Sequence, residues 1–269
     1  MACTLSTLAS NRGIDAFETS PVCGFGEVSM LPPPFDSGEK RALGEAGADL
    51  AINYPRLGVA PDLPCSTGRG GARNRADRES YALTLPQIAN LTAAERHAEA
   101  IGLPFTRFTT IHWEGAGVPL SGMVRATGRY IDLLTKALAR RSCRTAWIWV
   151  LENGEGKGGH CHLLVHIPAG LVGDVTALQR RWLRSITGNA YRSGVIRSVP
   201  IGGRLGLEAS HPELHAVNRE AALAYLLKGA DAEAAKRFGL ERLEPGGRII
   251  GRRCSTSQNI GAKARGERN

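Results

Sequence analysis

The chain has 269 residues, of which 42% are hydrophobic, and a net charge of +9, so it can form one large domain or two small ones. Its six cysteines include no Cys-x-x-Cys pair, which excludes the usual zinc-finger pattern and favours reduced thiols in the cytoplasm. The sequence lacks a signal-peptide pattern and the roughly 20 apolar residues of a membrane span. We therefore expect a cytoplasmic protein with no membrane partner, whose basic charge favours a polyanion such as nucleic acid.

The first part of the chain shows little hydrophobic periodicity. Residues 1–85 are rich in Gly, Pro, Ser and Arg, and we expect a low-complexity, flexible basic region there. Regular patterns follow it. LTAAERHAEAIG predicts a helix that begins at an N-cap Thr92 and ends at Gly102. FTRFTTIHW (105–113), with its β-branched and aromatic residues, predicts a strand.

The remaining patterns alternate between helix and strand. In chain order they are a helix at 128–141, strands at 145–152 and 160–168, a helix at 176–188, a strand with a turn at 193–203 and a helix at 211–231. NGEGKGG predicts a tight hairpin between the second and third strands, which excludes an all-parallel sheet. We expect an α+β fold with a mainly antiparallel sheet flanked by helices. This domain would span 86–250, and a short strand or turn and a basic tail would occupy 251–269.

Histidines are concentrated in the predicted strand GGHCHLLVHIP (158–168). Alternation places apolar residues on one face and His160, His162, Leu164 and His166 on the other. Imidazoles two positions apart can share one metal ion, and the hairpin brings Glu152 alongside them. Two imidazoles and a carboxylate with open coordination positions suit Mg²⁺ or Mn²⁺ bound to a phosphate oxygen. Alternatively, each histidine is a hydrogen-bonded structural residue, the interpretation that we favour for His166.

The last predicted helix carries a tyrosine and a lysine three positions apart, in AALAYLLKGAD. A spacing of 100° per residue places Tyr225 and Lys228 on the side opposite the leucines. A phenol can form a phosphodiester with DNA, and a nearby ammonium favours the phenolate. An ordinary solvated helix face is the alternative interpretation.

A polar segment follows in GRRCSTSQNIG. Four of its side chains suit contacts with DNA backbone phosphates: Arg252, Arg253, Ser255 and Thr256. A polar surface loop would have the same composition.

Taken together, these motifs resemble the HUH endonuclease superfamily, in particular rolling-circle replication initiator (Rep) proteins with a single catalytic tyrosine. FTTIHW corresponds to the first motif, HCHLLVHIP to the His-hydrophobic-His motif and AYLLKGA to the tyrosine motif, and the resemblance covers about 100–230. It implies an RRM-like palm in which His160, His162 and Glu152 hold the cation. It further implies that Tyr225 attacks a phosphate with help from Lys228, which leaves a 5′-phosphotyrosine and a free 3′-hydroxyl.

The resemblance also implies partners. The substrate would be single-stranded or hairpin origin DNA of a plasmid or a single-stranded phage. Because the sequence contains no GxxxxGK[ST], we expect a host helicase and polymerase to act in trans. With one tyrosine in the motif, a second nucleophile would have to come from another subunit or from water.

Other functions remain open at this point. A transposase or relaxase of the same superfamily shares the chemistry, and a non-catalytic DNA-binding protein could keep a degenerate site. A histidine-triad nucleotide hydrolase is disfavoured, because position 164 is Leu and the third histidine arrives only at His166.

Overall fold

The computed structural model describes residues 77–267, all within the unit Gly38–Asn269. The flexible region expected at 1–85 lies outside the described residues as far as residue 76. A five-stranded sheet has the order β5-β2-β4-β3-β7, and every neighbouring pair is antiparallel. Its strands are β2 (Arg107–His112), β3 (Trp147–Gly154), β4 (Gly158–Val165), β5 (Ile196–Pro200) and β7 (Cys254–Thr256). The predicted α+β fold with an antiparallel sheet is confirmed.

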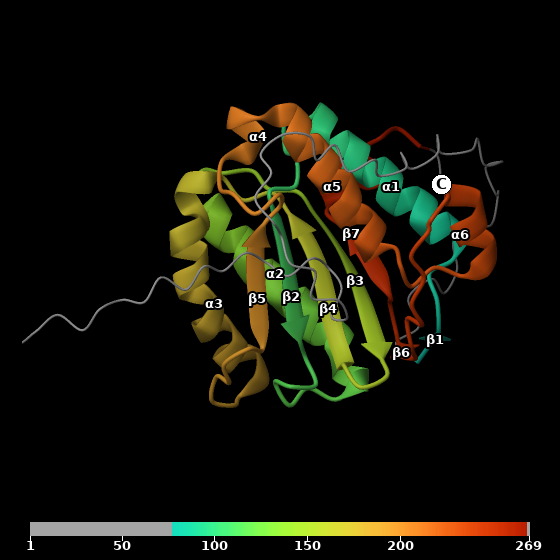
Figure 1. Ribbon diagram of the computed structural model, residues 1–269. Helices are drawn as coiled ribbons and strands as arrows, with labels where there is room; N and C mark the ends of the chain where they lie inside the picture. Colours follow the sequence, from blue (N-terminus) through green and yellow to red (C-terminus); the bar gives the residue numbers. More distant parts are fainter. Residues whose placement is uncertain (1–76, 268–269) are drawn as a thin grey trace, which may run out of the picture. The chain divides into compact units, whose positions relative to one another are not determined.

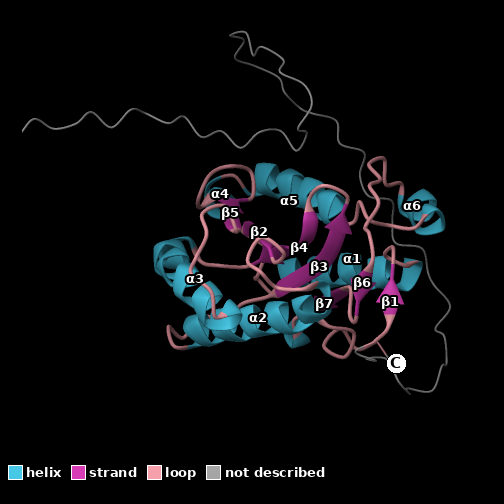
Figure 2. Cartoon of the chain, turned by 90° about the horizontal axis from the view of Figure 1, so that it is seen from below, coloured by secondary structure: helices cyan, strands magenta, loops and turns pink. Residues whose placement is uncertain are grey.

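Helices cover both faces of this sheet (Figures 1 and 2). One layer contains α2 (Met123–Ala139) and α3 (Val172–Thr187), and the other contains α1 (Leu85–Ala100), α4 (Leu207–Ser210), α5 (Pro212–Leu226) and α6 (Ala232–Phe238). A second sheet pairs β1 (Glu79–Ser80) with β6 (Ile249–Ile250). Short 3-10 helices complete the list: η1 (Leu120–Gly122), η2 (Ala169–Leu171) and η3 (Gln258–Ile260). No helix in residues 77–267 is long and apolar enough to span a membrane.

The alternation along β4 is as predicted, and in the structure it separates two hydrophobic cores. Cys161, Leu163 and Val165 are buried against α2 and α3, whereas Leu164 is buried on the other face, with Phe108. Because successive side chains of a strand point to opposite faces, His160 and His162 share the face of Leu164. The histidines therefore lie on the side of the sheet that α1 and α5 cover.

Helix α1 begins earlier than the sequence predicts. Thr84 is its N-cap: the Thr84 N–H donates to Gln87 Oε1 over 2.9 Å, and Pro86 occupies the first turn. The prediction of an N-cap at Thr92 was wrong, and this residue is buried in the middle of the helix. The predicted end is confirmed, since Gly102 adopts the left-handed conformation with φ of +72° just after the helix.

Helix α5 ends at Leu226, so the expected helix at 211–231 was too long. Beyond it, the carbonyl of Lys228 accepts a hydrogen bond from the Glu244 N–H, and the carbonyl of Gly229 accepts one from the Leu83 N–H. These partners lie outside the helix and redirect the backbone. Lys228 therefore sits in a turn and departs from the helical geometry assumed for it.

The C-terminal segment belongs to the fold and is not an appended tail. Strand β7 pairs with β3 along Cys254–Thr256, opposite Ile148–Val150. Ile260, in η3, is fully buried in the core beneath α1. The expected boundary at residue 250 is therefore corrected, because the next described residues supply an edge strand of the main sheet.

Candidate metal and tyrosine site

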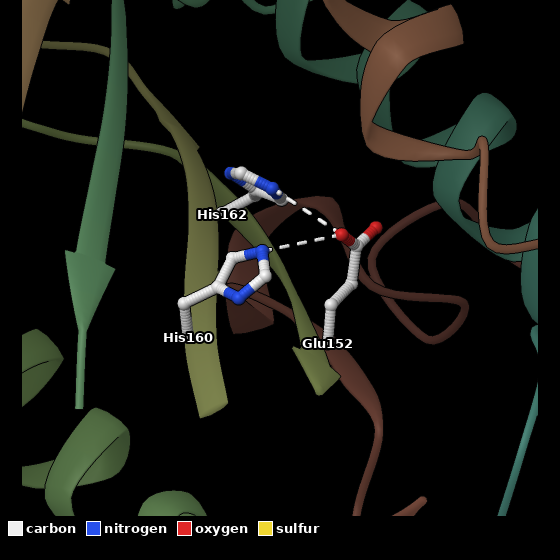
Figure 3. Close-up of side chains that lie close together, drawn as sticks. All are labelled: Glu152, His160 and His162. Carbon is white, nitrogen blue, oxygen red and sulfur yellow. Dashed lines mark ion pairs between the residues drawn. The ribbon is translucent and has the colours of Figure 1, made fainter. Parts of the chain in front are cut away.

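Three buried side chains from the β3–β4 hairpin meet on one face of the sheet (Figure 3). The register of the hairpin places Glu152 directly opposite His160. Glu152 Oε2 lies 3.3 Å from His160 Nε2 and 3.4 Å from His162 Nε2. All three side chains are almost fully buried. The sequence prediction that the hairpin brings Glu152 to the two histidines is thus confirmed by the geometry.

Each imidazole uses its other nitrogen to fix its orientation. His160 Nδ1 donates to the carbonyl oxygen of Gly158 over 2.8 Å, and His162 Nδ1 lies 3.0 Å from Thr110 Oγ1 on β2. Because a carbonyl oxygen only accepts, Nδ1 of His160 carries a proton, and Nε2 is the nitrogen that faces Glu152. Metal-binding histidines are commonly oriented by such hydrogen bonds.

Two buried polar atoms of this group have no hydrogen-bond partner among the described residues, and a cation could supply the missing partner. Among the described residues, Glu152 Oε1 and His162 Nε2 are buried without a hydrogen-bond partner. Leaving buried polar atoms unpaired is costly, and a divalent cation would satisfy both. Two imidazole nitrogens and a carboxylate oxygen form a reasonable donor set for such an ion, with ligand atoms all within 4.8 Å of one another. Glu152, His160 and His162 therefore form a group that can hold a divalent metal.

The electrostatics favour the protonation states that a metal requires. Burial alone would raise the pKa of the Glu152 carboxyl, but the imidazoles of His160 and His162 and the charge of Lys228 hold it well below its usual range. Burial lowers the pKa of His162 to about 4, despite the opposing effect of Glu152. Glu152 is thus ionised and His162 neutral near pH 7, which are the forms that coordinate metals.

Lys228 is part of the same buried group. Its side chain is 2% exposed, and Nζ donates to Glu152 Oε2 and lies 3.2 Å from Glu244 Oε2. The alternative in which Lys228 occupies a solvated helix face is excluded by this burial. The ammonium of Lys228 offsets the charges of Glu152 and Glu244, and Glu152 is one of the expected metal ligands.

Tyr225, near the C-terminal end of α5, faces the histidines. Its ring lies 5.3 Å from the ring of His162 and 5.6 Å from that of Phe108, centroid to centroid. Lys228 Nζ lies 4.9 Å from the centroid of the tyrosine ring. Burial raises the pKa of Tyr225, and Lys228 opposes this effect. The phenol is therefore protonated at neutral pH, next to a cation that favours its ionisation.

Sequence reasoning missed three neighbours of this group. His112 lies opposite His160 in the β2–β4 register, with ring centroids 5.5 Å apart, and the motif FTTIHW could have indicated it. Arg242 and Glu244 come from the irregular segment between α6 and β6, which has no periodic pattern. Their proximity to Tyr225 depends on tertiary structure alone.

The four residues expected to contact DNA do not form one surface. Arg253 is 1% exposed, and its guanidinium donates to backbone carbonyls that include Leu151, Gly246 and Gly247. Arg253 is therefore not available for the expected phosphate contact, and it stabilises the backbone through these hydrogen bonds. Arg252 is exposed and donates to Ser255 Oγ over 3.1 Å.

Ser255 and Thr256 occupy the edge strand β7. Ser255 is registered with Trp149, whose side chain packs against the α2–α3 core, whereas Thr256 is registered with Ile148 of the other core. The two hydroxyl-bearing side chains therefore lie on opposite faces of the sheet.

Comparisons with known proteins give little further information. No protein-family model and no curated protein matches the sequence. Among solved structures, the chain is similar to the N-terminal nuclease domain of non-structural protein 1 of minute virus of mice, which is described as having an unusual Zn²⁺ coordination in its active-site pocket and as recognising DNA at the origin of replication. The identity is 10% and the TM-score 0.27, over 50% of this chain and 70% of that one. Likeness at this level carries no argument, so the site must be interpreted from its own geometry.

Proposed function

We propose that this protein nicks and rejoins DNA by metal-assisted transesterification through Tyr225, as in the HUH endonucleases that its motifs resemble. One observation carries the proposal: Tyr225, Lys228 and the group Glu152–His160–His162 come from distant parts of the sequence and meet on one side of the sheet. A nucleophile, a cation-binding group and a lysine are the parts that such a reaction uses.

The cation would be held by His160, His162 and Glu152, and we propose Mg²⁺ or Mn²⁺. When bound, such an ion polarises a phosphate oxygen and offsets the negative charge that develops there. The protein keeps the two imidazoles oriented through Gly158 and Thr110.

Tyr225 would be the nucleophile. Its phenolic oxygen bonds to phosphorus while the bond between phosphorus and the 3′-oxygen breaks, and the 5′ side of the DNA remains attached to the tyrosine. The phenol loses its proton to solvent and the departing 3′-oxygen gains one, so the step is neutral in protons. Lys228 favours loss of the phenolic proton, because its ammonium lies against the ring. The free 3′-hydroxyl could then prime synthesis or attack the phosphotyrosine to rejoin the strand.

Origin DNA is the substrate that we propose, in single-stranded or hairpin form. The net charge of +9 favours a polyanion, and a half-buried phenol suits an unpaired, flexible strand better than a rigid duplex. We propose that the protein starts rolling-circle replication of a plasmid or a single-stranded phage, with a host helicase and polymerase in trans. A transposase or relaxase of the same superfamily would share this chemistry and would differ in its biological role.

The test is formation of a covalent protein–DNA complex. The full chain would be incubated with Mn²⁺ and a pool of labelled single-stranded oligonucleotides, and denaturing gels would reveal a protein band that carries label. We expect the band with the wild type and its loss with Tyr225→Phe, with His162→Asn or in EDTA. His166→Asn is the matched control, because His166 lies just beyond the end of β4 and its Nδ1 donates to the carbonyl oxygen of Pro104. If Tyr225→Phe still forms the adduct, Tyr225 is not the nucleophile. If the wild type forms no adduct, the alternative of a non-catalytic DNA-binding protein is favoured.

A further inference from the structure

Two cations lie close to the ring of Tyr225. Lys228 Nζ is 4.9 Å from the ring centroid and the guanidinium carbon of Arg242 is 5.1 Å from it, both within the range of a cation–π contact. Lys228 is buried, whereas the side chain of Arg242 is 40% exposed. The second cation therefore lies where a ligand can reach it from solvent.

One carboxylate holds both cations. Arg242 donates to Glu244 Oε1 through Nε over 3.0 Å and through Nη2 over 2.5 Å. The other oxygen of Glu244 lies 3.2 Å from Lys228 Nζ. Burial alone would raise the pKa of Glu244. Its contacts with Arg242 and Lys228 outweigh this effect and lower the pKa below its usual value, so the carboxylate stays ionised. Glu244 thus holds both cations close to the ring of Tyr225.

Basic side chains of the described residues gather near the phenol of Tyr225. Lys228 is compensated by Glu152 and Glu244, and Lys157 lies 3.6 Å from Glu244 Oε2 as a further cation. Lys157, Lys228 and Arg242 thus all lie close to Glu244. A phosphate beside Tyr225 would meet this basic group, and arginine is the side chain best suited to a phosphate, because its planar guanidinium can donate two parallel hydrogen bonds.

We propose that Arg242 binds the phosphate that Tyr225 attacks and that Glu244 positions Arg242 for this contact. The inference rests on the proposed function of Tyr225 and adds a residue that the three sequence motifs do not contain. The ligand is a phosphodiester before the reaction and a phosphotyrosyl diester after it. Arg242 would contact the non-bridging oxygens in both.

The first experiment measures the rate of adduct formation at saturating oligonucleotide, with Mn²⁺ and the full chain. We expect Arg242→Gln to lower this rate about 100-fold, a typical loss for one donor to a developing oxyanion, and Arg242→Lys to restore part of it. Glu244→Gln should lower the rate less than Arg242→Gln, since it only positions the guanidinium. Arg129→Gln is the matched control: Arg129 is also an exposed, ion-paired arginine, but it lies on α2 across the sheet.

The second experiment does not depend on catalysis or on a metal. Binding of the same oligonucleotide to Tyr225→Phe would be measured in EDTA at increasing salt concentration by fluorescence anisotropy. Adding Arg242→Gln should reduce the magnitude of the slope of log K against log salt concentration by about 0.7, where K is the association constant. This is the value for one phosphate contact on a single strand. Adding Arg129→Gln should leave the slope unchanged.

The outcomes separate this inference from the proposed function. If the wild type forms a Tyr225-dependent adduct and Arg242→Gln forms it at the same rate, Arg242 has no catalytic role and the inference fails alone. If no adduct forms with the wild type, the proposed function fails, and an unchanged salt slope would then overturn the phosphate contact as well. Thermal unfolding of Arg242→Gln and Arg242→Lys checks that both retain the fold, and a folded Arg242→Lys supplies the decisive comparison should the glutamine variant unfold.

Discussion

Tyr225 and His162 lie in van der Waals reach of each other, with ring centroids 5.3 Å apart and ring planes inclined at 74°. They are 63 positions apart in the sequence, and one belongs to the last long helix while the other belongs to the central strand of the sheet. Phe108 contacts both rings and supports this arrangement from β2. The pair defines where a cation and a nucleophile could act on one phosphate.

Thr110→Val should weaken metal binding without unfolding the protein. Thr110 Oγ1 lies 3.0 Å from His162 Nδ1 and orients the imidazole, and valine keeps the shape but not the hydrogen bond. Loss of such a supporting contact typically lowers metal affinity 10- to 100-fold. Isothermal titration with Mn²⁺ measures the change. Thr176→Val on α3, whose hydroxyl bonds only within its own helix, is the control, and equal affinities for both variants would show that Thr110 does not support the site.

Lys228→Gln should strengthen Mn²⁺ binding while it weakens catalysis. The ammonium bonds to Glu152 Oε2 and repels a divalent ion at the same carboxylate. Its removal should tighten binding about tenfold, which corresponds to about 1.4 kcal/mol. Titration calorimetry gives the affinity, and the rate of adduct formation gives the catalytic effect. Weaker metal binding in Lys228→Gln would mean that Lys228 supports the metal site and does not compete with it.

The sequence predicted those parts of the site that depend on local pattern. Period-two alternation and the turn NGEGKGG determine that Glu152 faces His160, and the structure has this register. The sequence pattern could not predict that Arg253 is buried. Its neighbours in the sequence suggest a surface arginine, and its burial depends on hydrogen bonds to the carbonyls of Gly246 and Gly247. The pattern could not place Arg242 either, because no periodicity describes the loop that carries it.

Helix limits show the same division between local and tertiary causes. The capping residues Thr84 and Gln87 were present in the sequence and could have indicated the start of α1. The end of α5 could not be read in this way, since it depends on hydrogen bonds from the Glu244 N–H to the carbonyl of Lys228 and from the Leu83 N–H to the carbonyl of Gly229.

Arg219→Met should destabilise the fold strongly, away from the proposed site. Arg219 is buried between α5 and α1, where it donates to Glu95 and lies 2.5 Å from Glu99 Oε2. Removing the arginine leaves the buried carboxylate of Glu95 without its partner, which typically costs about 3–5 kcal/mol. Urea unfolding gives the free energy. Glu95→Gln in the same chain should recover part of the loss, and a loss no larger than that of the surface variant Arg129→Met would show that the pair is not important for stability.

His215 should make the folded state less stable in mild acid. Burial lowers its pKa from 6.5, with a further contribution from Arg219. The unfolded chain therefore binds a proton at a higher pH than the folded chain does, and the free energy of unfolding falls as the pH drops below about 6.5. His215→Asn should show a weaker fall between pH 7 and pH 5 in urea titrations. Identical pH profiles for the two proteins would show that His215 does not contribute.

The central claim is that Glu152, His160 and His162 bind a divalent cation beside Tyr225. Crystals of the full chain grown with MnCl₂ and measured at the manganese absorption edge test it most directly, since anomalous scattering locates the ion without any knowledge of the DNA sequence. The account predicts one strong peak in contact with the Glu152 carboxylate and with Nε2 of both histidines, on the side of the sheet where the Tyr225 ring lies. Manganese bound at other residues, with none at these three, would contradict it.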